Sequence, residues 1–361
     1  MLIYIALIII LIIFSLLTLE EENYILYIAS TIFLFLILGF RNENVGTDTI
    51  YYLKFFNNPQ YGYHGDSVEF GYEYFQFLVK KFWDNKYFYL TINAFVSIFT
   101  LAFFIKKTSP HKILSLLLFV LVNQYYFLYF SAMRQSVAIG LFLISLYYLF
   151  KKDKNLPAFS LFYFLAFLFH TTVIWTLPII LVVRKIHFKK SYIYILLSLS
   201  FVIGVLKVLD YFSYFTLIFN TLSISGNMGE RYDGYALGEK FNDYDTSTIR
   251  LIKDYFPIYL LAMIATYYAR NIESPLYKLF IIGMILSQFI MSYPMSFRLV
   301  LYFVILGIVV LPKIFQNLNS KYWIYPFFIF ILFYKTYLIL DGQFIERSKG
   351  NIYVPYDIYI D

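Results

Sequence analysis

Arg134 and His170 are the residues of this sequence whose types and spacing are best suited to chemistry. Arg134 opens one apolar run and His170 closes the next, with the basic stretch 151–154 between them. If that stretch faces the cytoplasm, both residues emerge at the opposite face of a membrane, where ionisable groups are costly to keep. A guanidinium pairs with two phosphate oxygens, and an imidazole accepts a proton near neutral pH. The pair therefore predicts an anion site with a base beside it.

Other polar residues fall on the same predicted face of the membrane. They are Arg41, Asp48, Gln135, Arg231 with Tyr232, and Arg298. Arg134 and Arg298 stand at predicted helix N-termini, where free backbone N–H groups and the helix dipole favour an anion. Several arginines at this depth indicate a lipid phosphate or pyrophosphate as ligand. ATP is not indicated, because the chain has no G-x-x-x-x-G-K-[ST] motif.

Each of these residues also has a purely structural interpretation. Interfacial arginines often extend to lipid headgroups, a membrane histidine often bonds a neighbouring helix, and Asp48 suits a helix N-cap. Gly46, two residues earlier, is expected to allow a tight turn before that helix. All of these residues fall on the same predicted face of the membrane. This favours a shared site, because separate structural roles do not require a common face.

Composition places the chain among integral membrane proteins. Its 361 residues are 61% hydrophobic and only 14% charged, which suits a chain that is largely surrounded by lipid. The net charge of +7 is explained by basic residues in short cytoplasmic loops, so nucleic acid is not an expected partner. The chain has 0 Cys and 4 His, which excludes disulfides and thiolate sites and does not favour a metal cage. We expect no cofactor and no metal.

The apolar segments predict an all-α polytopic integral membrane protein with about 12 transmembrane or broken half-membrane helices. These segments are 2–19, 24–40, 87–105, 113–130, 134–150, 156–170, 171–183, 191–209, 251–269, 279–293, 299–311 and 323–340. Lys and Arg concentrate in alternate short loops, which puts those loops in the cytoplasm and both termini outside. We expect a single transmembrane domain over 1–361, with larger outer loops at 41–86 and 210–250. The first loop ends in a pattern typical of an amphipathic helix on the membrane surface.

The segment 156–183 lies between two basic loops, so both of its ends are expected on the cytoplasmic side. Its 28 residues are too few for two full crossings, and one straight helix would place its ends on opposite sides. Two short helices with an apex at His170-Thr171-Thr172 satisfy both conditions. Broken helices of this kind are tolerated where they line a polar cavity.

Several motifs of the chain resemble those of EpsG-type polysaccharide polymerases. The first outer-loop signature of that family is similar to R-N-E-N-V-G-T-D-T-I-Y-Y-L-K-F-F here. The second is similar to M-R-Q-S-V-A-I-G-L-F-L-I-S-L, followed by lysines and A-F-L-F-H-T-T-V-I. Later and looser motifs resemble G-E-R-Y-D-G-Y and F-R-L-V-L-Y-F. The resemblance runs from about residue 35 to about residue 310.

The resemblance implies a Wzy-type polymerase of O-antigen, capsule or exopolysaccharide repeat units. Such proteins are multi-pass glycosyltransferases of the bacterial inner membrane, with the active site on the periplasmic side. They take undecaprenyl-pyrophosphate-linked oligosaccharides as both donor and acceptor and need no nucleotide sugar. The growing chain passes from its lipid carrier to the non-reducing end of a fresh lipid-linked unit. Membrane lipids and a chain-length regulator protein are further candidate partners.

The chemistry that the resemblance implies gives roles to the polar residues of the outer face. His170 is the expected general base for the acceptor hydroxyl, and Asp48 orients it or replaces it. Glu69 and Glu73 are alternative bases. Arginines stabilise the pyrophosphate leaving group, and Gln135 orients the donor or its carrier. The residues expected to bind pyrophosphate or substrate are Arg41, Arg134, Gln135, Arg231, Tyr232 and Arg298.

Three other functions stay open on the sequence. An O-antigen ligase transfers the same donor to a lipid A core and shares the architecture, and only the resemblance favours the polymerase. A flippase or transporter of the lipid-linked unit also binds pyrophosphate, but its arginines line a path through the membrane. A structural scaffold for envelope assembly does not require Arg and His to converge.

Overall fold

The computed structural model describes residues 2–19, 21–58, 68–122, 125–208, 247–291 and 297–315, together with short stretches after residue 329. These residues form helices joined by loops. The described part of the chain contains no strand beyond an isolated bridge between Arg41 and Ile358. The prediction of an all-α chain is confirmed.

The chain divides into two compact units, and each is described by itself. Unit 1 comprises Met1–Ile174 and Ile308–Asp361, and unit 2 comprises Trp175–Gly307. The described helices of unit 1 are α1 Leu2–Leu17, α2 Tyr24–Gly39, α3 Thr49–Asn57, α4 Phe70–Phe82, α5 Lys86–Thr108, α6 Lys112–Leu121, α7 Tyr125–Ser131, α8 Met133–Phe150, α9 Leu156–Phe169 and, from its border, α17 Gly307–Phe315. Those of unit 2 are α10 Leu177–Val182, α11 Lys190–Val205, α14 Thr248–Tyr268, α15 Pro275–Phe289 and α16 Phe297–Val304. The 3-10 helix η2, Thr171–Thr176, joins the two units in the chain.

Three helices of the described residues are long and apolar enough to cross a membrane: Lys86–Thr108, Met133–Phe150 and Arg298–Phe315. A fourth crossing arises if α6 and α7 form one span that is bent by 62°. Other apolar helices are shorter; α1 has 16 residues and rises about 24 Å, less than the ~30 Å hydrocarbon core. Each predicted apolar segment within the described residues does form helix, but about 12 crossings are not confirmed. The predicted segment 323–340 lies largely outside the described residues.

Asparagines set the starts of three apolar helices of unit 1. Asn23 accepts hydrogen bonds from the backbone N–H groups of Ile25 and Leu26, at 2.9 and 3.1 Å, so α2 begins at the residue after it. Asn85 caps α5 and Asn155 caps α9 in the same way. Each cap satisfies N–H groups that have no partner inside the helix, and the position of the asparagine therefore fixes the helix start.

Side-chain contacts show that α5 and α8 run in the same direction. The hydroxyls of Ser97 and Ser136 lie 2.8 Å apart, and further along both helices the ring centres of Phe103 and Tyr147 lie 5.8 Å apart. The starts of α5 and α8 therefore lie at the same end of unit 1.

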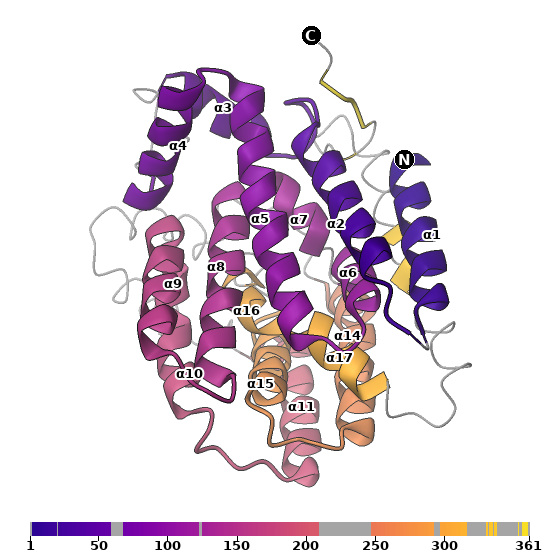
Figure 1. Cartoon of the computed structure of the whole chain (residues 1–361). Coiled ribbons are helices and arrows are strands. Elements are labelled where there is room, and N and C mark those ends of the chain that lie inside the picture. Colours follow the sequence, from indigo (N-terminus) through magenta and orange to yellow (C-terminus); the bar gives the residue numbers. More distant parts are fainter. Residues whose placement is uncertain are drawn as a thin grey trace. The chain divides into compact units, whose positions relative to one another are not determined.

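The opposite direction of α2 brings its C-terminus to that same end. Tyr27, near the start of α2, donates to the carbonyl of Ala102 near the end of α5, at 2.6 Å. Thr91, near the start of α5, donates to the carbonyl of Gly39 at 3.1 Å. The short helices α3 and α4 lie at this end of unit 1 (Figure 1). We call it the α3–α4 end.

The first of the short basic loops predicted to be cytoplasmic, 106–112, lies at the other end of unit 1. Lys106 donates to the hydroxyl of Tyr24, and Lys112 pairs with Glu22. The sequence predicts that these lysines and Arg134 lie on opposite faces of the membrane. Within unit 1 they do lie at opposite ends, since Arg134 is at the start of α8.

A tight turn and an amphipathic helix shape the described parts of the first predicted outer loop. The turn before α3 has a φ of 102° at Gly46, and a Cβ atom there would lie 2.6 Å from the carbonyl oxygen of Phe130. The tight turn expected at Gly46 is confirmed. α4 leaves Phe70 and Phe82 70% and 82% exposed, an outward apolar face typical of a helix at a membrane surface. The second predicted loop, 210–250, lies outside the described residues up to residue 246.

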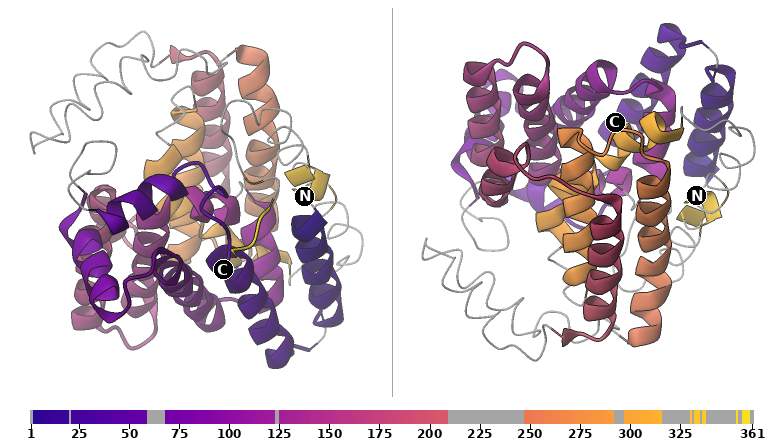
Figure 2. Two further views of the ribbon diagram at one scale, coloured as in Figure 1. Left: turned by 90° about the horizontal axis from the view of Figure 1, so that it is seen from above. Right: turned by 90° about the horizontal axis from the view of Figure 1, so that it is seen from below.

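α11, α14 and α15 pack side by side in unit 2 (Figure 2). Ser200 of α11 donates to Oε1 of Gln288 in α15 at 3.1 Å, and the hydroxyls of Ser198 and Tyr259 link α11 to α14 at 3.0 Å. Polar groups between apolar helices are costly without partners, so these bonds fix how each helix is rotated.

Candidate functional site

Arg134 meets a carboxylate at the α3–α4 end of unit 1. It lies in the first turn of α8, and its Nη1 is 2.5 Å from Oε2 of Glu69. Both side chains are only 11% exposed, which protects the ion pair from screening by water. Nε of Arg134 also donates to the hydroxyl of Tyr52 at 3.3 Å, and the guanidinium carbon lies 5.8 Å from the centre of that ring. Residues from two separate places in the chain thus hold the guanidinium.

Glu69 reaches its partner because α4 packs tightly against the end of α9. A Cβ atom at Gly71 would lie 2.6 Å from Cβ of Leu168, so a side chain at this position would push the two helices apart. The ring of Phe169 lies 6.4 Å from that of Tyr72. Glu69 occupies the N-cap position of α4 but makes no capping bond, and its carboxylate bonds α8 instead.

Buried aromatic side chains support this arrangement from α3, α4 and α5. The hydroxyls of Tyr72 and Tyr89 bond each other, and the rings of Phe56 and Tyr89 stack with centres 4.8 Å apart. The ring of Tyr52 meets that of Tyr72 edge-on at 5.6 Å, and Met133 of α8 belongs to the same buried cluster. The cluster therefore fixes α3 and α4 against the start of α8.

His170 ends α9 beside the start of α4. Its backbone is extended, with φ −157° and ψ 109°, which breaks the helix before η2. The predicted break at His170 is confirmed. Oγ1 of Thr172 lies 2.8 Å from Nδ1 of the imidazole and orients the ring. The residue as a whole is half-buried.

The pKa of Glu69 depends on its burial and on two neighbouring groups, Arg134 and His170. Burial by itself raises the pKa of Glu69, but Arg134 and then His170 lower it, so the pKa lies below the usual value for a glutamate. The carboxylate is therefore ionised at neutral pH. Arg134, Glu69, His170 and Tyr52 form one electrostatic group, which we call the Arg134 site.

The structure brings together two of the residues predicted from the sequence, Arg134 and His170, and adds Glu69 and Tyr52. From the sequence, Glu69 is only an alternative base. Its pairing with Arg134 spans 65 residues of chain, and opposite charge is the one signal in the sequence that points to it. Tyr52 has no such signal, since it is one of 38 tyrosines.

Arg41 has a very different environment at the same end of unit 1. Its side chain is buried, and its guanidinium donates to the carbonyls of Leu38, of Val45 at 3.1 Å and of Phe130 at 2.9 Å. Burial lowers the pKa of Arg41 to about 10, which leaves it charged at neutral pH. These bonds tie the end of α2 to α7. The geometry therefore favours an architectural role for Arg41 over the predicted contact with pyrophosphate.

Asp48 and Gln135 lie near these two arginines. Asp48 stands at the N-cap position of α3, where the helix was expected to begin, but its carboxylate makes no capping hydrogen bond. The expected side-chain cap is therefore wrong. Instead, Thr47 bonds the hydroxyl of Ser131 through its N–H and its own hydroxyl, at 3.1 and 2.9 Å. Gln135 lies next to Arg134 in α8 and is 1% exposed.

The remaining predicted residues lie elsewhere. Arg298 is half-buried in the first turn of α16 and belongs to unit 2, so it is described apart from the Arg134 site. It opens the apolar helix Arg298–Phe315, at an N-terminus that favours an anion. Arg231 and Tyr232 lie outside the described residues.

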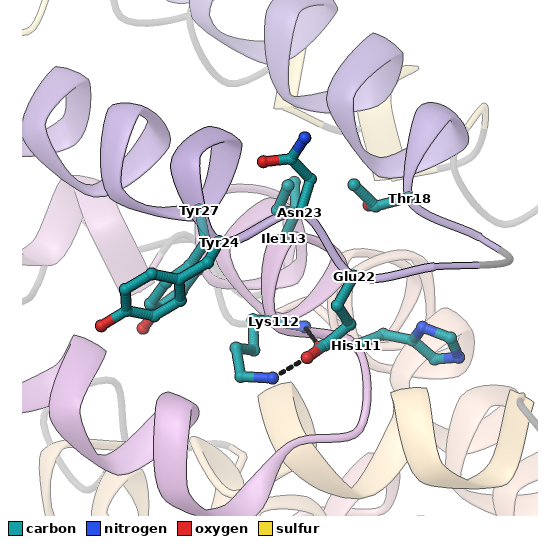
Figure 3. Close-up of a pocket in the computed structure, with 8 residues that line it drawn as sticks. All are labelled: Thr18, Glu22, Asn23, Tyr24, Tyr27, His111, Lys112 and Ile113. Carbon is teal, nitrogen blue, oxygen red and sulfur yellow. Dashed lines mark hydrogen bonds and ion pairs between the residues drawn. The ribbon is translucent and has the colours of Figure 1, made fainter.

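A small pocket of about 70 Å³ lies at the other end of unit 1, lined by the ends of α1, α2 and α6 (Figure 3). Glu22 accepts a hydrogen bond from the backbone N–H of Lys112 at 3.1 Å and pairs with its ammonium group, beside His111. None of the predicted site residues lines this pocket. Within the described ranges, no three His, Asp or Glu side chains gather in a way that holds a metal ion.

The comparison with protein families covers nearly the whole chain. A family model described as the EpsG family matches residues 24–358. The chain belongs to the EpsG family. It is a membrane protein of the polysaccharide-polymerase type, and the family implies a glycosyltransferase-like polymerase. The EpsG match includes the complete Arg134 site. Searches of curated proteins and of solved structures found no match.

Proposed function

We propose that this EpsG-family protein joins undecaprenyl-pyrophosphate-linked oligosaccharide repeat units into O-antigen, capsular polysaccharide or exopolysaccharide. The observation that carries the proposal is an arginine suited to phosphate beside a histidine suited to proton transfer, within one compact unit. Family membership supplies the polymerase type. The lipid-pyrophosphate donor is inferred from the chemistry of Arg134 and His170.

His170 is the proposed general base. A base must present an unprotonated nitrogen to the acceptor sugar hydroxyl. Nδ1 of His170 lies 2.8 Å from Oγ1 of Thr172. In the tautomer that we propose, Nδ1–H donates to that hydroxyl and Nε2 is the basic atom. Nε2 then takes the proton of the acceptor hydroxyl while the hydroxyl oxygen attacks the anomeric carbon of the donor.

Arg134 is the proposed ligand of the leaving group. As the new bond to the anomeric carbon forms, the bond from that carbon to the pyrophosphate oxygen breaks, and pyrophosphate leaves with the electron pair. The guanidinium stabilises the charge that develops on those oxygens. Because Arg134 lies in the first turn of α8, the N–H groups of the helix start add to the same effect.

The other predicted residues keep supporting roles in this proposal. Asp48 is an alternative base, and Gln135 orients the donor or its carrier. Arg298, Arg231 and Tyr232 keep their proposed role as ligands of pyrophosphate or sugar.

The proposed setting is the bacterial inner membrane, with the Arg134 site at the periplasmic face. One observation and one general rule support this orientation: the site and the basic residues Lys106 and Lys112 lie at opposite ends of unit 1, and basic loops of membrane proteins stay in the cytoplasm. About twelve crossing or half-membrane helices remain the proposed topology, with the short helices forming broken spans around a polar cavity. Membrane lipids surround the chain, and a chain-length regulator protein is a proposed partner.

The test is the ladder of polysaccharide lengths in a strain that lacks this gene. The strain is complemented with wild type, Arg134→Ala or His170→Ala at matched membrane levels. We expect wild type to restore the ladder and each variant to leave single repeat units. Normal ladders from both variants would remove the Arg134 site from the reaction.

Matched controls separate the site from general effects of charge. His187→Ala changes an 81% exposed histidine, and Arg250→Ala changes a 45% exposed arginine that pairs with Asp254. Both are expected to give normal ladders. Loss of attachment to lipid A with normal chain lengths would indicate a ligase, and unpolymerised units that stay on the cytoplasmic side would indicate a transporter.

A further inference from the structure

Glu69 pairs with the arginine of the Arg134 site, and its helix α4 packs against the end of α9, where His170 lies. It pairs with Arg134 at 2.5 Å, and the charge of His170 also acts on it. The two partners come from different helices, α8 and α9. One carboxylate therefore bonds the group proposed to bind phosphate and acts electrostatically on the group proposed to act as base.

The backbone of Glu69 is fixed while its carboxylate can exchange partners. The contact of Gly71 with Leu168 holds the start of α4 against the end of α9. Glu69 makes no capping bond to α4, so an exchange of its partner breaks no capping bond of that helix. The charged and titratable groups around the pair are Arg134 from α8, Tyr52 from α3, His170 from the end of α9, and Tyr72 and Glu73 from α4.

Anions and Glu69 compete for the same guanidinium. A carboxylate and a phosphate both bind Arg through its N–H groups, and two anions on one arginine repel each other. A pyrophosphate carries more charge than a carboxylate and is therefore the stronger ligand. The carboxylate that it displaces has a second cationic partner nearby in His170.

We propose that Glu69 couples pyrophosphate binding at Arg134 to proton transfer at His170. Pyrophosphate takes Arg134 from Glu69, and the negative charge of the released carboxylate, no longer neutralised by Arg134, acts on the nearby imidazole of His170 and strengthens it as a base. The acceptor hydroxyl is then activated only when the donor is bound, which limits wasteful reactions with water. Glu69 is a positioning residue in this scheme, because it acts through Arg134 and His170. The proposal rests on the proposed function for the identity of the anion.

The experiment measures binding of inorganic pyrophosphate to the full-length protein in lipid nanodiscs by calorimetry. Glu69→Gln removes the competing charge, and we expect it to bind pyrophosphate ~tenfold more tightly than wild type. Glu69→Asp keeps the charge but shortens its reach to Arg134, so a smaller gain in the same direction is expected. Tighter binding is a gain that misfolding cannot produce. The matched control is Asp84→Asn, which removes an equal charge from a 65% exposed side chain just after the end of α4 and is expected to bind as wild type does.

Turnover distinguishes coupling from simple competition. In reconstituted polymerisation, Glu69→Gln is expected to lower both KM and kcat, and Glu69→Asp to recover part of kcat. Unchanged or weaker binding by both Glu69 variants would overturn the coupling.

Arg134→Ala separates this proposal from the proposed function. If Arg134→Ala abolishes pyrophosphate binding while the Glu69 variants match wild type, the anion site stands and the coupling fails. If Arg134→Ala binds pyrophosphate as wild type does, the anion site itself is wrong.

Discussion

Arg41 and Arg134 lie at the same end of unit 1, yet their surroundings differ in kind. Arg41 is 1% exposed and bonds backbone carbonyls from three places in the chain. Arg134 is 11% exposed and bonds side chains, the carboxylate of Glu69 and the hydroxyl of Tyr52. Backbone carbonyls cannot leave without unfolding the loop, whereas a carboxylate can be exchanged for another anion. The partner of an arginine, more than its depth, therefore separates an architectural role from a binding role.

Arg134→Ala is expected to have the largest effect on activity. Loss of a charge that stabilises the leaving group lowers polymerisation by ~100-fold or more, and Arg134→Lys recovers only part of it, because an ammonium does not bind two oxygens in a fork. Rates are measured with protein that is matched for membrane level and thermal stability. A variant with a normal melting temperature and a normal rate would place Arg134 in the same architectural class as Arg41.

Arg41→Ala is expected to destabilise the folded protein. It leaves three buried carbonyls without their donor, which lowers the free energy of unfolding by roughly 2–4 kcal/mol. Thermal unfolding in detergent measures this, with Arg134→Ala as the comparison that shifts the melting temperature less. If Arg41→Ala keeps its stability and loses polymerisation, then Arg41 binds the substrate as expected from the sequence.

Gly71→Ala tests whether the distance between α4 and α9 positions the Arg134 site. The new methyl group would lie 2.6 Å from Cβ of Leu168 and 2.8 Å from its carbonyl oxygen, so α4 must shift and carry Glu69 with it. We expect polymerisation to fall by ~tenfold, the effect of a displaced positioning group. Gly39→Ala is the control, since a Cβ there meets its nearest neighbour at 3.3 Å. Equal activity of the two variants would show that the close approach is dispensable.

The sequence predicts features that depend on neighbouring residues in the chain, but not those that depend on contacts between distant segments. Helix starts at Asn23 and Asn85 follow from local capping, and the break at His170 follows from segment length and loop charge. The partners of Arg41 and Arg134 lie up to 89 and 82 residues away, and the same guanidinium suits either role, so the sequence cannot separate them. The predicted number of membrane crossings is not confirmed for another reason: several apolar helices are too short to span the membrane alone.

Stability in acid tests the ion pair of the Arg134 site. The pKa of Glu69 is lowered in the folded protein, so its contribution to stability is fully present above the unfolded value of about 4.3 and is lost as pH falls through the lower folded value. We expect the melting temperature of wild type to hold from neutral pH to about pH 5 and to fall in more acidic buffer. Glu69→Gln is expected to lose less over the same acidic range. A wild-type loss between pH 7 and pH 5 that Glu69→Gln abolishes would contradict the lowered pKa.

Tyr52→Phe is expected to have the smallest effect. It removes one hydrogen bond to Nε of Arg134 and keeps the ring beneath the guanidinium, which corresponds to roughly 0.5–1.5 kcal/mol, or a few-fold in rate. Kinetics of the purified variant measure it, and Tyr51→Phe, on the exposed side of α3, is the control. A loss as large as that of Arg134→Ala would mean that the tyrosine hydroxyl itself takes part in the reaction.

The most direct measurement is polymerisation by the purified protein in liposomes that contain a lipid-linked repeat unit, with released undecaprenyl pyrophosphate counted against new glycosidic bonds. Wild type is expected to release one lipid pyrophosphate for each bond formed, and His170→Ala and Arg134→Ala to release almost none, although both remain folded. Bond formation at the wild-type rate by either variant, or polymer growth without release of the lipid pyrophosphate, would contradict the assignment of the Arg134 site as the place of glycosyl transfer.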